Sequence, residues 1–261
     1  MRFKRAYIVF GLALAATVAF ASVSWATHTP QPASVTFTKT GKETSKGAPG
    51  TLAIDLGPDV DDPATPDPVP PKPTNVDVDL SKGLTFGGSQ FPTCSAASLE
   101  GVPPTGPGSA QSLCGNEAPK SKNALIATGT AKAQVGPNVL DATALAFNGG
   151  ANSVIIYARV DALSLTTILN CTLSPAPDQS KFKSRFACPV PPLAGGAGAL
   201  TEFHLKFDRV EKKVKKKHGK KKKKIYSIIT GKCPEDGQYQ NQVTFTYSDH
   251  EPETAVSNQP C

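Results

Sequence analysis

The sequence predicts an all-β protein, built as an antiparallel β-sandwich or jelly-roll-like fold of about eleven strands. Helical periodicity is almost absent, and short β-prone runs recur between clusters of Gly, Pro, Asn, Asp and Ser. Several runs alternate: Phe203, Leu205 and Phe207 are separated by polar residues, and residues 243–247 repeat the pattern. One apolar and one polar face is typical of an antiparallel sheet that packs on a second sheet.

Eleven runs are expected to form strands. In chain order they are residues 35–39, 51–56, 76–80, 124–135, 142–147, 154–160, 163–169, 186–190, 200–210, 225–230 and 239–247. The glycine-rich stretch at 194–198 is expected to be a turn before the strand that begins at Leu200, because glycine interrupts regular structure. The pattern does not determine the order of the strands.

The N-terminus has the three parts of an export signal. Residues 1–5 are basic, residues 6–20 are apolar, and Ser24-Trp25-Ala26 has the small-x-small pattern that signal peptidase cleaves. We therefore expect a signal peptide at 1–26 and a mature chain that begins at Thr27. The protein is expected to be secreted, extracellular or held in the cell envelope. After cleavage no transmembrane segment is expected.

Two alternatives to this cleavage stay open. Ala19-Phe20-Ala21 offers a second cleavage site after Ala21. The apolar run can also stay in place as a membrane anchor, although its fifteen residues are fewer than the roughly 20 that a membrane-spanning helix needs.

The mature chain is expected to have a disordered N-terminus at 27–33 and a single β-sandwich domain at 34–261. Residues 58–73 contain seven prolines and four aspartates, which are Asp59, Asp61, Asp62 and Asp67. Proline fixes φ and removes a backbone donor, so 57–74 is predicted to be an extended surface connection. A separate N-terminal unit is less favoured, because residues 34–56 supply only two strands and two strands alone are marginal in water.

All six cysteines lie in the mature chain, and an oxidising compartment favours disulfides between them. Six cysteines allow fifteen pairings, and proximity in the sequence favours three of them: Cys94–Cys114, Cys171–Cys188 and Cys233–Cys261. Zinc is the alternative, but the chain has no C-x-x-C spacing. Its histidines are also scattered, at His28, His204, His218 and His250.

The positive charge is concentrated in one segment. The formal net charge is +7, and loss of Arg2, Lys4 and Arg5 with the signal peptide lowers it to +4. Residues 211–224 contribute +9, from ten lysines and one glutamate, so the rest of the mature chain carries about −5. The sequence therefore describes a mildly acidic body with one basic segment.

This basic segment is predicted to form the tip of a long hairpin, because β-prone runs flank it and Gly219 can adopt the positive φ of a chain reversal. Its lysines are expected to bind an anionic cell-wall polymer, a polysaccharide or another polyanion. They are Lys212, Lys213, Lys215, Lys216, Lys217, Lys220, Lys221, Lys222, Lys223 and Lys224. No aromatic residues alternate with them, so specific nucleic-acid binding is not expected. The alternative is a solvated tip without a partner.

No motif points to catalysis, a metal ion or a cofactor, and none of these is expected. The chain has no H-E-x-x-H and no G-x-S-x-G. His204 is the one histidine on a predicted strand, and the alternation places it on the solvent-facing side. Asp77 and Asp79 share a strand face and can join residues 59–67 around calcium, but the usual calcium-loop spacing is missing, which favours a merely acidic surface.

Several short motifs follow one another in a recognisable order. They are Phe91-Pro92-Thr93-Cys94, Cys114, Gly129-Thr130-Ala131, Ala146-Phe147-Asn148-Gly149, Gly195-Gly196-Ala197-Gly198-Ala199-Leu200-Thr201, Gly231-Lys232-Cys233-Pro234 and Cys261. In this order they resemble a group of uncharacterised secreted all-β proteins of soil actinobacteria, over most of residues 34–261. The resemblance implies the fold class and an exported protein, and it implies no activity. The lysine-rich segment is not part of it.

The sequence thus favours a non-enzymatic β module that is exported and binds polyanions through its lysine-rich hairpin. One alternative is a secreted hydrolase or carbohydrate-active protein on a β-sandwich scaffold, which a concave cluster of Asp, Glu or His would indicate. Another is a structural or matrix protein without a ligand.

Overall fold

The computed structural model describes residues 31–57, 72–196, 198–217, 220–248 and 251–261, and for residues 212–224 it describes the backbone alone. The predicted signal peptide at 1–26, residues 27–30 and most of the predicted connection at 57–74 lie outside the described residues. Within those ranges, no helix has both the length and the apolar composition that crossing a bilayer requires.

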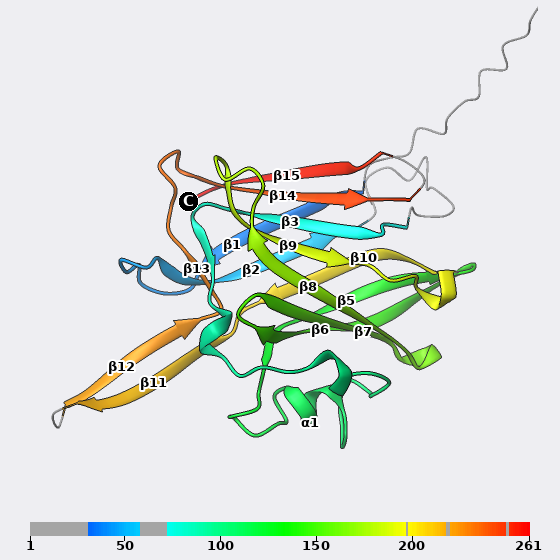
Figure 1. The fold of residues 1–261 in the computed structure, drawn as a ribbon, viewed down its shortest axis with the longest axis horizontal. Helices are drawn as coiled ribbons and strands as arrows, with labels where there is room; N and C mark the ends of the chain where they lie inside the picture. Colours follow the sequence, from blue (N-terminus) through cyan, green and yellow to red (C-terminus); the bar gives the residue numbers. More distant parts are fainter. Residues whose placement is uncertain (1–30, 58–71, 197, 218–219, 249–250) are drawn as a thin grey trace, which may run out of the picture.

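The prediction of an antiparallel, disulfide-stabilised all-β fold is confirmed (Figure 1), with 57% strand, 8% helix and no closed barrel. The described residues form more strands than the predicted eleven. These strands are β1 (Ala33–Lys39), β2 (Ala48–Leu56), β3 (Asn75–Ser81), β4 (Leu84–Phe86), β5 (Leu125–Val135), β6 (Asn138–Gly150), β7 (Ser153–Val160), β8 (Leu165–Pro175), β9 (Phe182–Pro189), β10 (Gly198–Phe207), β11 (Val210–Lys217), β12 (Lys220–Ser227), β13 (Ile229–Gly231), β14 (Gln238–Thr246) and β15 (Glu253–Pro260).

The helices are short. One is α-helical, α1 (Ala110–Cys114), and the others are single 3₁₀ turns, η1 (Gly88–Gln90), η2 (Ala96–Ser98), η3 (Asp161–Leu163) and η4 (Ala194–Gly196). The side chain of Ser109 caps α1 by accepting a hydrogen bond from the Ser112 amide at 3.1 Å.

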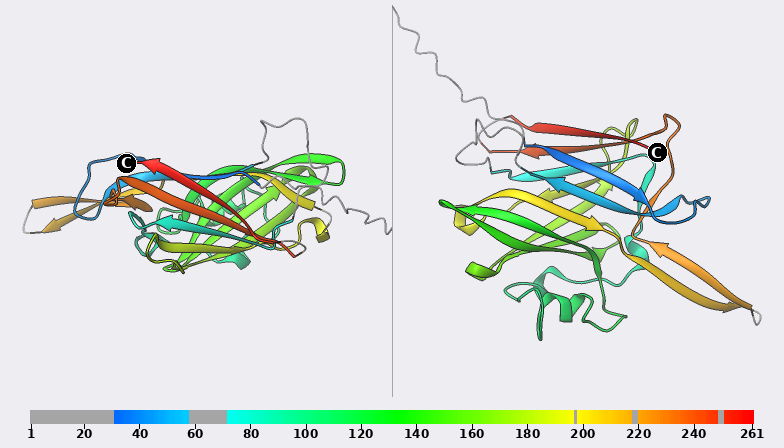
Figure 2. Two further views of the ribbon diagram at one scale, coloured as in Figure 1. Left: turned by 90° about the horizontal axis from the view of Figure 1, so that it is seen from above. Right: turned by 180° about the vertical axis from the view of Figure 1, so that it is seen from behind.

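One sheet of thirteen strands makes up the body. Its strands follow the order β15-β14-β3-β9-β8-β7-β6-β5-β10-β2-β13-β4, and β1 pairs with β2 beside this path. The sheet folds over on itself as a sandwich, so that β1 lies against β14 and β15 although these strands are at opposite ends of the order (Figures 1 and 2). The molecule therefore has two layers made from one continuous sheet.

Side chains, rather than a strand ladder, join β1 to β15. The amide of Phe37 donates to Gln259 Oε1 at 2.7 Å, and Gln259 Nε2 donates to the Phe37 carbonyl at 2.8 Å. The amide of Val35 donates to Ser257 Oγ at 3.0 Å, and Asn241 Nδ2 donates to the Val35 carbonyl at 3.1 Å. The outer edge of β1 is thereby hydrogen-bonded without another strand.

The core has two parts. The larger part fills the interior of the folded sheet and includes Phe37, Leu52 and Phe245, all almost fully buried. The smaller part lies on the outer face of β5–β7, beneath the segment that contains η2 and α1, and includes Phe147 and Tyr157. Both faces of β6 are therefore buried, which explains why its middle section is apolar at successive positions.

The three disulfides join the cysteine pairs that sequence proximity favours: Cys94–Cys114, Cys171–Cys188 and Cys233–Cys261. They have different structural roles. The first closes the segment that covers the outer face of β5–β7, the second links β8 to β9, and the third ties the loop before β14 to the residue after β15.

Several predicted boundaries were wrong. The run 200–210 is interrupted after β10, and the run 225–230 is interrupted at Ile228, because the chain leaves the body there as a hairpin and returns. Strand β15 was missed because it lies at the sheet edge and alternates between half-buried and exposed residues. Strand β1 begins at Ala33, which pairs with Leu56 in β2.

Two buried tyrosines offer a matched test of the core. Tyr157 donates its hydroxyl to the Val102 carbonyl at 2.7 Å, whereas the Tyr239 hydroxyl has no hydrogen-bond partner among the described residues. We expect Tyr239→Phe to raise the free energy of unfolding by about 1 kcal/mol and Tyr157→Phe to lower it by about 1 kcal/mol. Urea denaturation at pH 7 measures both. The same sign for both variants would contradict this assignment of the hydroxyls.

The burial of Tyr239 can also be tested by measuring how the free energy of unfolding depends on pH in the wild type and in Tyr239→Phe. Burial raises the pKa of Tyr239 above its usual value of 10.0. The unfolded chain therefore releases this proton first, and its ionisation lowers the free energy of unfolding as the pH rises above about 10. Tyr239→Phe is expected to reduce the loss of stability in that range.

The hydrogen bonds that side chains of β14 and β15 make with the backbone of β1, called the seam below, can be tested at Gln259. Gln259→Ala removes two of them and leaves the amide and the carbonyl of Phe37 without these partners. The expected loss is about 2 kcal/mol of unfolding free energy. Asn258→Ala is the control, because Asn258 is exposed on the opposite face of β15 and its replacement should change stability by less than about 0.5 kcal/mol. Equal effects of the two variants would refute the seam.

Candidate functional site

The lysine-rich segment is a two-stranded antiparallel hairpin, as predicted, although the strands continue through the segment that was expected to be its tip. β11 and β12 pair with each other and with no further strand among the described residues. The hairpin projects from one end of the body in every view (Figures 1 and 2). We call this hairpin of β11 and β12 the arm.

The backbone register places lysine opposite lysine along the arm. The cross-strand partners are Lys213 with Lys224, Lys215 with Lys222, Lys216 with Lys221, and Lys217 with Lys220. Directly opposed positions have Cβ atoms about 4.5–5.5 Å apart, and like charges at such positions destabilise a strand pair. The arm therefore places eight of its ten lysines at directly opposed backbone positions.

Arg209 anchors the base of the arm to the body. Its Nη1 donates to Asn123 Oδ1 at 2.6 Å and to the Leu125 carbonyl at 2.7 Å. Its Nη2 forms a 2.5 Å ion pair with Glu211, and its guanidinium lies 5.6 Å from the centre of the Phe91 ring. The hydrogen bonds use the N–H groups of the guanidinium, and the ring of Phe91 makes a cation–π contact with it.

Backbone hydrogen bonds complete this anchor. The Ile228 amide donates to the Arg209 carbonyl at 2.9 Å, and the Gly87 amide donates to the Ile228 carbonyl at 2.8 Å. The arm therefore leaves the body from a fixed point between β13 and the turn after β4.

A polar groove of about 570 Å³ lies between three loops on the side of the body from which the arm projects. Its lining comes from the turn between β3 and β4, the loop between β8 and β9, and the loop between β13 and β14. The lining residues are Ser81, Lys82, Gly83, Ser180, Lys181, Lys232, Cys233, Pro234, Glu235, Asp236, Gln238 and Gln240. Its volume falls in the range typical of small-molecule sites.

Close backbone packing brings these loops together. The Lys232 amide donates to the Gly83 carbonyl at 2.9 Å, and a Cβ at Gly83 would clash with the Lys232 carbonyl oxygen. Only glycine fits there, because the two backbones touch. The disulfide from Cys233 and the hydrogen bond from the Cys261 amide to the Gly237 carbonyl, at 3.0 Å, hold the third loop.

The three lysines of the groove are exposed. Within the described part of the chain, no ion pair joins Lys82, Lys181 or Lys232 to a carboxylate. Glu235 and Asp236 also line the groove. The groove therefore combines ammonium groups with hydrogen-bond acceptors and amides.

Other charged residues are paired. Arg185 lies 2.9 Å from Asp77 and 2.6 Å from the buried Asp79, and its hydrogen bond to Asp79 raises the pKa of Arg185. This cation was not considered in the sequence interpretation of Asp77 and Asp79, because β9 is far from β3 in the chain. Their carboxylates form an ion-pair network with it rather than a free acidic surface.

His204 lies on the exposed face of β10, on the side the alternation predicted. Its Nδ1 is 2.9 Å from Asp55 Oδ1, and its Nε2 is 3.9 Å from Glu202. Lys132 is 2.9 Å from Glu202, and hydrogen bonding to Glu202 raises the pKa of Lys132. These four side chains form a surface charge network across β2, β10 and β5.

An apolar cavity of about 50 Å³ opens between β5–β8 and β10. Alanine side chains such as Ala133 and Ala142 leave this space, and Thr167 supplies the one hydroxyl in its lining. The cavity offers no charged group for catalysis or polar recognition.

The remaining residues that the sequence analysis considered lie outside the described part of the structure. They are the side chains of the ten hairpin lysines, the histidines His28, His218 and His250, and the aspartates Asp59, Asp61, Asp62 and Asp67. The groove was not predicted, because its lysines are isolated in the sequence. The sequence held a partial signal for the groove in Gly231-Lys232-Cys233-Pro234, where a lysine directly precedes a cysteine that forms a disulfide.

No family model matches the chain, and neither a curated protein nor a solved structure was found to match it. Its function has to be inferred from its own residues.

The anchor predicts a stability effect of Arg209. Arg209→Met keeps an apolar stem but leaves Asn123, Leu125 and Glu211 without the guanidinium. Because the arginine is only 13% exposed, we expect a loss of about 3 kcal/mol in urea denaturation. Lys206→Met, at an exposed position of β10, is the control and should change stability by less than about 0.5 kcal/mol. A neutral result for Arg209→Met would mean that the anchor contributes nothing to folding.

Proposed function

We propose that the protein is an exported, non-enzymatic module that binds polyanions through the β11–β12 arm. The observation that carries this proposal is the register of the arm, which opposes lysine to lysine at four levels outside the main sheet. No structural need of the body explains such an arrangement, because the arm pairs only with itself among the described strands.

The charge density of the arm suits a polymer. A strand rises about 3.4 Å per residue, so ten lysines on two strands give about one positive charge per 2 Å of arm length. Duplex DNA carries about one negative charge per 1.7 Å. Like charges at opposed strand positions destabilise the strand pair, and a polyanion along the arm reduces this repulsion.

The acidic remainder of the mature chain supports the proposal. With about −5 outside the arm, the body repels a polyanion and directs it to the basic end. The wall polymers, acidic polysaccharides and other polyanions of the extracellular space have the complementary charge. The three disulfides suit a protein that works in that oxidising space.

The test compares matched sets of lysines. One variant replaces five arm lysines by glutamine, at Lys213, Lys215, Lys217, Lys220 and Lys222. The control variant replaces five exposed body lysines, at Lys42, Lys46, Lys120, Lys122 and Lys206. Both lose five positive charges, so their net charges are identical.

The arm variant is expected to lose affinity for polygalacturonate and for an isolated phosphate-containing wall polymer, while the control keeps most of it. The slope of log affinity against log salt should fall by about 0.7–0.9 for each lysine that no longer displaces a counterion. Duplex DNA in the same assay should show affinity without sequence preference. Equal retention by the arm variant and the wild type would refute the proposed function.

A further inference from the structure

We infer that the groove lined by Lys82, Lys181 and Lys232 is a second binding site, which takes a hydroxyl-rich unit bearing a negative charge, such as a uronic acid in an acidic polysaccharide. This inference rests on the proposed function, since it names the class of polyanion that the same end of the molecule binds.

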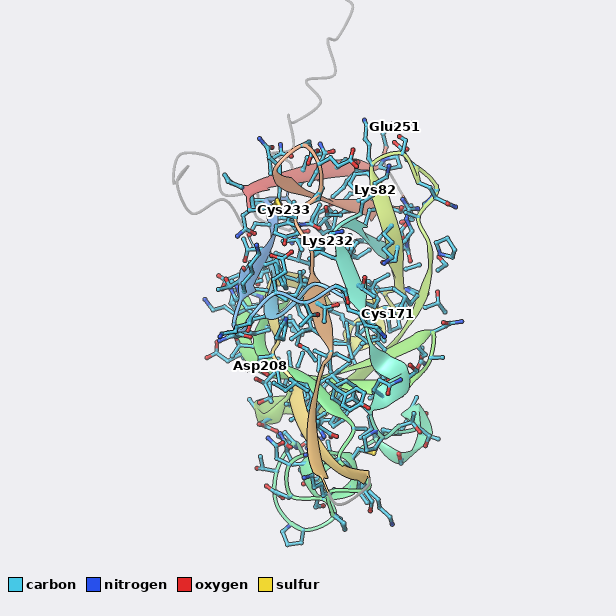
Figure 3. The ribbon with its side chains drawn as sticks, turned by 90° about the vertical axis from the view of Figure 1, so that its left-hand side faces the viewer. Lys82, Cys171, Asp208, Lys232, Cys233 and Glu251 are labelled. Atoms are coloured by element: carbon cyan, nitrogen blue, oxygen red, sulfur yellow. A yellow bond between two sulfur atoms is a disulfide. The ribbon has the colours of Figure 1, made fainter. Side chains whose placement is uncertain are left out.

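The position of the groove is the first argument. Figure 3 looks onto the side of the molecule from which the arm projects. Lys82, Lys232 and Cys233 lie in the upper part of this view, above Asp208, which precedes the arm. One polymer can therefore contact the arm and the groove together, and two linked contacts strengthen binding beyond either alone.

The charges of the groove are the second argument. Its three ammonium groups have no carboxylate partner among the described residues, whereas Arg185, Arg209 and Lys132 all do. Three unpaired cations around one groove, in a body with a net negative charge, provide a local site for an anion.

The remaining lining identifies the kind of anion. Ser81, Ser180, Gln238 and Gln240 supply hydroxyl and amide groups, and Glu235 and Asp236 supply acceptors. Such acceptors would repel a bare polyphosphate but can accept hydrogen bonds from sugar hydroxyls. The described lining contains no aromatic side chain, so it gives no surface for stacking a nucleic-acid base.

The groove is also held in shape before a ligand binds. The contact between Gly83 and Lys232 fixes two of its loops, and the Cys233–Cys261 disulfide fixes the loop that carries Glu235 and Asp236. Gln238 and Gln240 are two residues apart on β14 and therefore lie on the same face of that strand. A preformed site loses less entropy when it binds.

A short ligand isolates the groove from the arm. Trigalacturonate carries a carboxylate on each of its hydroxylated rings, and tripolyphosphate carries more charge without such rings. Calorimetry compares both ligands on the wild type, on the triple variant Lys82→Gln, Lys181→Gln and Lys232→Gln, and on the control triple variant Lys42→Gln, Lys46→Gln and Lys122→Gln. The five-lysine arm variant is the fourth protein.

The expected result is that trigalacturonate binds the wild type, the control and the arm variant alike, more tightly than tripolyphosphate, and about tenfold more weakly to the groove variant. The residues replaced in the groove variant and in its control are exposed, and thermal unfolding checks that all four proteins are folded. Absence of trigalacturonate binding, a preference for tripolyphosphate, or equal weakening in the control would each overturn the inference.

The polymer separates this inference from the proposed function. Both the groove variant and the arm variant should weaken polygalacturonate binding. If only the arm variant does so, the groove inference fails and the proposed function stands. If only the groove variant does so, the proposed role of the arm fails.

Discussion

The hydrogen-bonded seam between β1 and the strands β14 and β15 determines how the single sheet closes into two layers. Gln259 satisfies both backbone groups of Phe37, while Asn241 Nδ2 donates to Val35 and its Oδ1 accepts from the Ser81 amide at 2.9 Å. These side chains connect the two ends of a thirteen-stranded sheet without a continuous ladder. These bonds occupy the backbone groups of Val35 and Phe37 on the outer edge of β1, which hinders another chain from pairing there.

The proposed binding end depends on this closure. Ser81 immediately precedes Lys82 in the groove, and β2, which pairs with β1, also pairs with β13, which Lys232 follows. The arm begins from the same region, because β12 is continued by Ile228 and β13. A change in the seam would therefore be transmitted to the relative positions of the groove and the base of the arm.

The positively charged side chains fall into two classes, those that pair with a carboxylate within the fold and those that we propose bind a ligand. Arg185, Arg209 and Lys132 each have a carboxylate partner, and the two arginines are largely buried with theirs. Such pairs neutralise charges within the fold. The lysines of the groove are exposed and lack such partners among the described residues, which leaves their charge for a ligand.

The sequence by itself determined the fold class and the existence of the hairpin, and proximity in the sequence favoured the three disulfide pairs that the structure contains. Alternating runs such as 203–207 are local patterns, and cysteines 17 to 28 residues apart can be paired by proximity. Local pattern could not reveal β15, whose residues alternate without a fully buried face, or the break at Arg209, whose partners lie more than 80 residues away.

Only the tertiary structure decided the seam, the Arg185 network and the groove. Each joins segments that are distant in the sequence, such as the turns that carry Lys82, Lys181 and Lys232. Their meeting depends on which strands become neighbours, and that order is set by burial of the whole core and by closure of the sheet.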